Sequence, residues 1–290
     1  MMNLAEYRRK SSHLADFLPW AALVGAGVVL NKDGSFQRTA RFRGPDLDSA
    51  VPAELVAVAG RINNALRRLG SGWAVFVEAQ RVPALSYPDS QFPDAASALV
   101  DAERKAQFEE EGTHFESRYF LTLLYLPPAE EAARAERFLY EGRDRESGAN
   151  ARETLAGFVD RTDRVLQLLE GFMPECIWLN DVETLTYLHA TISTKVQHVR
   201  VPEVPMHLDA LLADQPLTAG LEPMLGNAHL RILTITGFPS ATTPGILDDL
   251  NRLAFPYRWS TRAIMLDKTD AARLLSKIRR QWFAKRKSIA

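Results

Sequence analysis

The stretch Tyr119-Phe-Leu-Thr-Leu-Leu-Tyr-Leu126 decides how the fold of this chain is built. It is apolar at almost every position, which is the pattern of a central strand whose two faces are both covered. Pro127-Pro128 follows, ends the strand and favours a helix from there to about Tyr140. The sequence therefore predicts a sheet with a buried strand in its middle.

Upstream of this strand the sequence predicts a hairpin, two helices and a further strand. The run Val28–Leu30 enters the turn Asn31–Gly34, and the residues from Phe36 to Phe42 then alternate between apolar and polar. Asp-Gly is a strong signal for a tight turn, because glycine accepts a positive φ. The other upstream elements are a helix from Pro52 to Leu69, a strand from Trp73 to Gln80 and a polar helix over residues 94–111.

Downstream, apolar periodicity predicts a helix over residues 155–169, a strand at Cys176–Leu179 and a helix capped by Asp181. A connector with two prolines, Val199–Pro205, suggests a domain boundary near residue 200. The elements expected beyond it are a strand at Leu230–Thr236, a helix from Thr243, a strand at Tyr257–Leu266 and a last helix at Asp267–Ala290.

Strands and helices alternate along the chain, but the connections differ in length and the first pair of strands is a hairpin. We therefore expect an α+β fold with mixed sheets and packed helices, built from ferredoxin-like subdomains. Residues 1–200 would form an N-terminal lobe that opens with the hairpin. Residues 201–290 would form a second lobe of strand, helix, strand and helix.

The charge of the chain is uneven. The net charge is −1, which argues against a general nucleic-acid-binding protein, because such proteins carry a basic excess. Residues 271–290, however, contain seven basic residues and no acidic one, whereas the first 270 residues carry 28 basic and 36 acidic residues. This asymmetry predicts that the C-terminal helix meets a partner.

The sequence contains no recognisable motif of a catalytic or cofactor site. A phosphate-binding loop needs a glycine followed by lysine, and none of the 16 glycines is followed by lysine. Gly25-Ala26-Gly27 begins a dinucleotide-binding signature, but Leu30 stands where its third glycine should be. No two histidines have the spacing of zinc ligands on a helix, and the single cysteine, Cys176, fits a reducing compartment and a buried thiol. We predict no catalytic, cofactor-binding or metal-binding residue.

The C-terminal helix carries the candidate contact residues for a partner. Its apolar stripe should be covered by the body of the protein up to about Ile278, and its basic end should stay free. A protein partner is our preferred interpretation, and contact with nucleic acid is the alternative, because cations and aromatic residues interleave there. The candidate residues are Arg279, Arg280, Trp282, Lys285, Arg286 and Lys287.

Several stretches together resemble the N-terminal region of the TrbE-type conjugal-transfer ATPases of the type IV secretion (VirB/TrbE/CagE) family. The resemblance spans nearly the whole chain. The stretches are Leu14–Trp20 (LADFLPW), Val28–Phe36 (VVLNKDGSF), Phe42–Asp46 (FRGPD), Leu185–Ser193 (LTYLHATIS) and Arg280–Lys287 (RQWFAKRK).

The resemblance implies a module that assembles but does not catalyse. Family members continue into a RecA-like motor that would hold ATP and Mg²⁺, and this chain has no positions that correspond to it. The N-terminal region of the family contributes oligomer contacts and docks the motor beside a small inner-membrane subunit. A cytoplasmic location, peripheral to the inner membrane, is therefore expected. The residues themselves leave two alternatives open: an unrelated enzyme or ligand-binding protein whose site shows no motif, and a nucleic-acid contact module that uses the basic helix.

Overall fold

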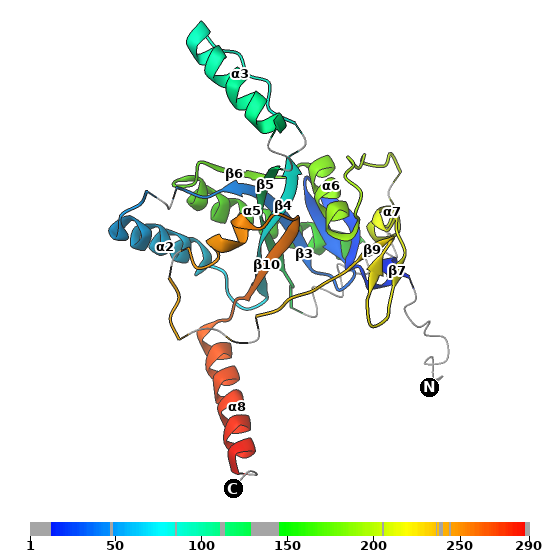
Figure 1. The fold of residues 1–290 in the computed structure, drawn as a ribbon. Coiled ribbons are helices and arrows are strands. Elements are labelled where there is room, and N and C mark those ends of the chain that lie inside the picture. The colour runs from blue at the N-terminus through cyan, green and yellow to red at the C-terminus, as the bar shows by residue number, and fades with distance from the viewer. Residues whose placement is uncertain are drawn as a thin grey trace.

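The computed structural model describes residues 13–46, 49–84, 86–110, 114–128, 145–204, 206–235, 237, 240–243 and 245–287. Its main feature is a seven-stranded sheet with the order β1-β2-β3-β5-β4-β10, in which β6 also pairs with β3 (Figure 1). The strands are β1 Trp20–Gly25, β2 Val28–Asn31, β3 Phe36–Arg43, β4 Trp73–Ala84, β5 His114–Tyr125, β6 Glu175–Trp178 and β10 Tyr257–Ile264. A small second sheet contains β7 Leu217–Thr218, β8 Met224–Leu225 and β9 Ala228–His229.

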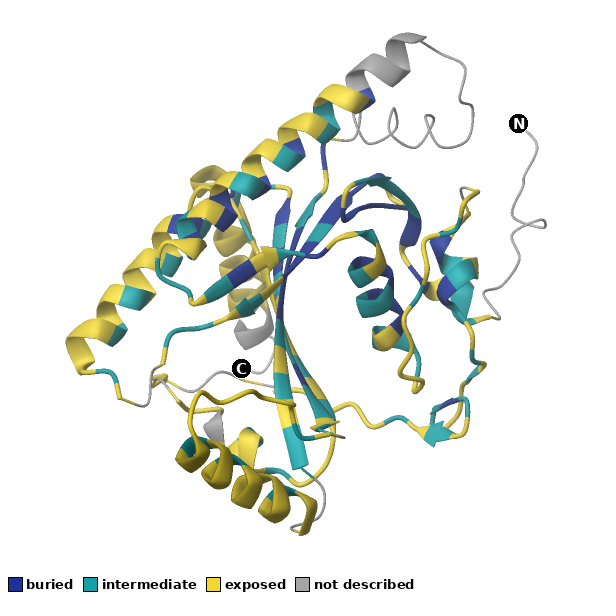
Figure 2. Ribbon diagram, turned by 90° about the horizontal axis from the view of Figure 1, so that it is seen from above, coloured by how far each residue is buried: buried dark blue, intermediate teal, exposed yellow. Residues whose placement is uncertain are grey.

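The helices of the described residues lie on both faces of this sheet or project from its ends (Figure 1 and Figure 2). They are α1 Leu14–Phe17, α2 Pro52–Leu66, α3 Ala95–Glu110, α5 Arg145–Glu170, α6 Asp181–Ile192, α7 Leu208–Leu212, the 3-10 helix η2 Asp248–Arg252 and α8 Lys268–Lys287. The helix predicted from Pro128 to Tyr140 falls almost wholly outside the described residues. The cap of α6 is Asn180 rather than Asp181, because the Asn180 side chain accepts a hydrogen bond from the Glu183 amide.

The predicted central strand is confirmed. β5 lies between β3 and β4, and Leu123 stands opposite Arg38 on one side and Val75 on the other. Its side chain is completely buried, as the continuous apolar pattern requires. The predicted hairpin is confirmed as well, since β2 and β3 pair across a turn in which Gly34 has a φ of 81°.

The α+β class is confirmed, and one subdomain has the expected ferredoxin-like topology. Apart from α3, which is inserted between β4 and β5, the elements from β3 to β6 read β-α-β-β-α-β, and the strands lie in the order β6-β3-β5-β4. Every pairing in the described residues is antiparallel, so the expectation of mixed sheets is wrong. The helical crossover from β3 to β4 does make these two strands parallel, but β5 is inserted between them, so they never pair.

Each face of the sheet has its own core. On one face, α2 and α5 pack through a cluster in which the Phe158 ring stacks on Trp73 and Phe36, with 5.7 Å between centroids in each pair. On the other face, α6 and α7 pack against β1 through a smaller cluster that includes Leu185 and Leu212. Figure 2 shows the two layers, with the long α5 along one side of the sheet and α6 on the other.

The sheet continues past the predicted boundary near residue 200. β10 pairs with β4 along eight residues, from Tyr257 opposite Arg81 to Ile264 opposite Ala74. An ion pair reinforces this edge, because the Arg258 guanidinium binds the Glu78 carboxylate and also donates to the Ala190 carbonyl at 2.9 Å. A strand from residues 201–290 therefore belongs to the same sheet as the strands of residues 1–200.

Two elements expected after residue 200 do not form. Residues 230–235 contain no strand, and Ile232 and Leu233 are 82% and 93% exposed. A strand needs a neighbouring edge, and no described strand pairs with this segment. The helix expected from Thr243 is reduced to the short η2, because Gly245 has a φ of 80°, which a helix cannot contain.

Two helices project from opposite ends of the body (Figure 1). α3 lies beyond the end of the long β4–β5 pair, and α8 extends the chain after β10. The projecting α8 contains all of the candidate contact residues. None of the helices in the described ranges is both long and apolar enough to cross a membrane.

Candidate partner-binding surface

The base of α8 is fixed to the loop that precedes β4. The Ser71 hydroxyl donates to Asp270 at 2.5 Å and accepts from the Asp267 amide at 3.0 Å, while the Ser71 amide donates to the Asp267 carboxylate at 3.3 Å. Gly70 lets this carboxylate approach, because a Cβ atom at that position would lie 2.5 Å from Asp267 Oδ1. The first turn of α8 is therefore held by the body.

Beyond its base, the apolar stripe of α8 is uncovered. Leu275 is 66% exposed, the largest exposed fraction in the stripe, and Ile278 is 50% exposed. The rings of Trp282 and Phe283 contact each other edge-on, with 5.2 Å between centroids. The exposed apolar residues of the helix are Leu274, Leu275, Ile278, Trp282 and Phe283. The expectation that the body covers the stripe up to Ile278 is therefore wrong, because α8 projects from the sheet instead of lying on it (Figure 1).

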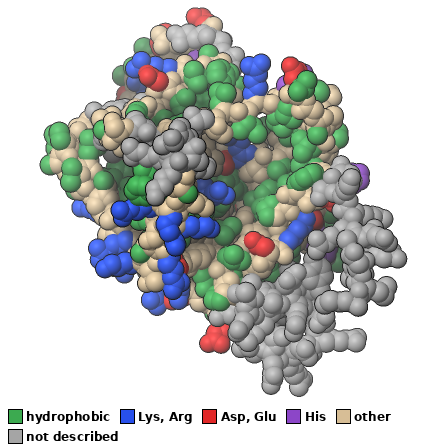
Figure 3. Space-filling model, turned by 90° about the horizontal axis from the view of Figure 1, so that it is seen from below, with side chains coloured by type: hydrophobic (Ala, Val, Ile, Leu, Met, Phe, Trp, Pro, Cys, Tyr) green, Lys and Arg blue, Asp and Glu red, His purple; other side chains and the backbone are tan. Residues whose placement is uncertain are grey.

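Basic residues flank the apolar stripe. The Arg279 guanidinium lies 5.6 Å from the centre of the Phe283 ring, and Arg280 Nε donates to the Ser276 carbonyl at 3.3 Å. These local contacts leave both side chains exposed along the helix, and Figure 3 shows Lys and Arg side chains gathered there next to apolar ones. The side chains of Lys285, Arg286 and Lys287 lie outside the described atoms, although their backbone continues the helix.

We call the uncovered stripe and its basic flanks the α8 surface: Leu274, Leu275, Ile278, Arg279, Arg280, Trp282 and Phe283. The structure brings the described candidate residues together on one helix. Such a surface can bury apolar area at its centre and pair charges at its rim, which is the usual composition of a protein–protein contact. No sequence signal pointed to the anchor at Ser71, because it lies 196 residues from Asp267.

A small polar cluster surrounds the buried side chain of His189. His189 Nε2 lies 3.3 Å from the Asp214 carboxylate, which also pairs with Lys195 at 2.9 Å. Burial raises the pKa of Asp214, but hydrogen bonds from Lys195, His189 and Ser193 together outweigh it and hold this pKa below its ordinary value. The cluster ties α6 to the segment after α7.

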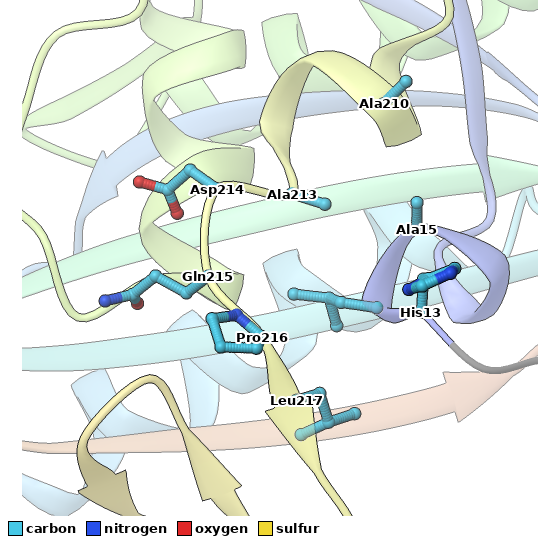
Figure 4. A pocket seen from close by; sticks show the side chains of 9 residues that line it. His13, Ala15, Ala210, Ala213, Asp214, Gln215, Pro216 and Leu217 are labelled. Carbon is cyan, nitrogen blue, oxygen red and sulfur yellow. The ribbon is translucent and has the colours of Figure 1, made fainter.

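A pocket of 410 Å³ lies beside this cluster. It is formed where α1, α7 and β7 meet, and its lining includes His13, Ala213 and Leu217. In Figure 4 the side chains of Asp214 and Gln215 point away from His13 and Leu217. The pocket therefore presents mainly small apolar side chains, an arrangement without an evident acid–base pair.

The thiol of Cys176 is held in the core. Cys176 is buried, and burial, followed by the charges of Glu170 and Glu175, raises the pKa of its thiol to about 11. Gly27 has a φ of 64° in the turn between β1 and β2, and its amide donates to Asp181 at 2.6 Å. Within the described residues, no three His, Cys, Asp or Glu side chains are grouped as metal ligands would be.

Comparison with known proteins identifies the family. Residues 27–133 match the family model for the N-terminal domain of the type IV secretion system ATPase VirB4/TrbE. Conjugal transfer protein TrbE of Rhizobium radiobacter is 36% identical over 97% of this chain, and the chain spans 36% of the length of that relative.

Two shorter matches come from Sinorhizobium fredii, in which a probable conjugal transfer protein TrbE is divided into two separate chains. The first of these chains is 42% identical over 49% of this protein and is covered over 98% of its own length. The second is 36% identical over 34% of this protein and 15% of its own length. On these matches, the chain belongs to the VirB4/TrbE family of type IV secretion proteins and corresponds to the N-terminal domain of TrbE.

Proposed function

We propose that this chain is an assembly and docking module of a conjugal type IV secretion machine. It makes contacts between copies and with subunits of the inner-membrane complex, including a small membrane subunit, at the cytoplasmic face. The observation that carries the proposal is the α8 surface, an apolar stripe that the body leaves uncovered on a helix whose base is anchored.

The physical argument rests on what an isolated helix needs. A helix of 20 residues that projects into water is only marginally stable by itself, because most helix stability in proteins comes from packing of the apolar face. A partner that covers Leu275, Ile278 and Trp282 would supply that packing. The basic flanks would select a partner with an acidic rim and would also speed its encounter.

ATP hydrolysis does not belong to this module in our proposal. The sequence contains no Gly-Lys pair to cradle and neutralise the phosphates of a nucleotide. This chain spans 36% of the length of the Rhizobium radiobacter relative, so the rest of that relative leaves room for a motor domain. ATP and Mg²⁺ would bind in such a motor, and the module would position it.

The test compares two substitutions of equal charge on one helix. Ile278→Asp places a carboxylate in the α8 surface, whereas Ala284→Asp places it about 120° away around the helix, on the side that carries no residue of this surface. We expect Ile278→Asp to lower self-association in light scattering and co-purification with the small membrane subunit at least tenfold. Ala284→Asp should leave both measurements unchanged. Equal results for the two variants would remove the α8 surface from the proposal.

Nucleic acid is the alternative partner, since Arg279, Arg280 and Trp282 combine cations with an aromatic ring. A mobility-shift titration with single-stranded DNA separates the two functions. If an Arg279→Gln, Arg280→Gln variant loses DNA binding while self-association and co-purification persist, the helix is a nucleic-acid contact instead.

A further inference from the structure

A second surface, separate from α8, lies where the end of α2 meets α5. A hollow of 350 Å³ is lined there by Arg68, Leu69, Arg161, Arg164 and Val165. Leu69 and Val165 are almost completely buried, whereas all three arginines are exposed. The hollow therefore has an apolar base and guanidinium groups at its open side.

Positive charge in the hollow is only partly balanced. Arg164 pairs with Asp160 at 2.8 Å, one helical turn earlier on α5. Arg68 and Arg161 form no ion pair or hydrogen bond with the described residues. Three guanidinium groups and one carboxylate leave two positive charges around the hollow, and like charges that converge repel one another unless an anion separates them.

We propose that this hollow binds a phosphate monoester group. Such a group carries about −1.5 to −2 charges at neutral pH, which matches the two uncompensated positive charges. Arginine binds phosphate oxygens through two parallel N–H donors, so arginines from α5 and from the turn after α2 can bind one phosphate from different directions. The apolar base suits the organic part of the ligand, which can be a small soluble molecule or the headgroup of a lipid.

The scaffold under the hollow is rigid, as a preformed anion site requires. Leu69 and Val165 belong to the same core cluster as Ala65, Phe158 and Leu169, which joins α2 to α5. Arg161 and Arg164 are three residues apart and so lie on the same face of α5. Binding of the ligand therefore costs little conformational entropy of the protein backbone.

The test uses three phosphate sources and two charge-matched variants of the full chain. Inorganic phosphate and glycerol phosphate are titrated by calorimetry, and vesicles of phosphatidylcholine are used with and without phosphatidic acid. The variant carries Arg68→Gln and Arg161→Gln. The control carries Arg152→Gln, on α5 but outside the hollow, and Arg252→Gln, in η2, and therefore has the same net charge.

We expect the original chain and the control to bind at least one of the phosphate sources, and the variant to bind it about a hundredfold more weakly, at about tenfold for each arginine. Binding of glycerol phosphate identifies a soluble ligand, and binding only of phosphatidic acid vesicles identifies a lipid headgroup. The bound source should also raise the melting temperature of the original chain but not that of the variant. The proposal is overturned if no source binds, or if the control loses binding as the variant does.

Discussion

At the scale of single residues, burial decides what the only cysteine of this chain can do. Cys176 lies opposite Phe42 in the β3–β6 pair and is almost inaccessible. The thiolate is the reactive form, and a pKa of about 11 leaves nearly all of the thiol protonated at pH 8. We predict that a disulfide reagent labels Cys176 at least 100-fold more slowly in the native protein than in the protein unfolded in guanidinium, measured by absorbance.

The control for this prediction is Cys176→Ala, which should remove the slow labelling altogether. Rapid labelling of the native protein would mean that β6 opens frequently from the edge of β3. It would also place this strand among the least stable parts of the sheet.

Asp214 links the stability of the protein to pH. Its pKa in the folded state is held below the ordinary value of 3.8, so the folded state favours the carboxylate. The stabilisation is complete above pH 3.8 and is lost as the pH falls through the lower, folded pKa. We predict that Asp214→Asn lowers the free energy of unfolding by about 0.5–1 kcal/mol at pH 7, because the partners keep a weaker acceptor and solvent screens this exposed carboxylate.

The measurement is urea unfolding at a series of pH values. The original protein should lose stability below pH 3.8 more steeply than the variant, and the two curves should converge in acid. Parallel curves over this range would mean that Asp214 has the same pKa in the folded and unfolded states.

At the scale of elements, the middle of the sheet offers a comparison within one strand. Leu123 is fully buried between β3 and β4, whereas its neighbour Leu124 points to the opposite face and is half-buried. We predict that Leu123→Ala lowers the free energy of unfolding by about 2–5 kcal/mol, because it leaves a cavity, and that Leu124→Ala costs less. Denaturation followed by circular dichroism checks both, and a loss below about 0.5 kcal/mol at Leu123 would place β5 at the surface.

The elements whose formation follows from the apolar pattern of their own residues were predictable from the sequence. The continuous apolar run of β5 and the helical periodicity of α5 each indicate which of their side chains are buried. Residues 230–235 have an equally good strand pattern and form no strand, because a strand also needs the backbone of a neighbour. Local pattern cannot report whether that neighbour exists.

The same distinction applies to the candidate surfaces. The stripe of α8 could be read from spacing within 20 residues, and its candidate residues do share one helix. The exposure of this stripe could not be predicted, because it depends on the orientation of α8, which the contacts between Ser71 and Asp267 fix. The hollow between Arg68 and Arg161 gave no signal at all, since it exists only where two helices meet.

At the scale of the whole molecule, the absence of a nucleotide-binding loop from the sequence leads to a binding prediction. Calorimetry with ATP and Mg²⁺ should detect no saturable binding, because no Gly-Lys pair is present to hold the phosphates. A known P-loop ATPase at the same concentration serves as the positive control. Micromolar affinity that a single substitution in this chain abolishes would contradict the prediction and restore an enzymatic function.

The pairing of β4 with β10 means that the edge of β4 stays unpaired during synthesis until β10 has been made. Glu78 and Arg258 are 180 residues apart, so a ribosome that adds 5–20 residues per second needs roughly 10–35 s to make β10 after β4. During that interval the growing chain carries an open strand edge, to which other nascent chains can add. Translation speed through residues 79–257 therefore becomes a determinant of yield, and slowing it should increase the demand for chaperones.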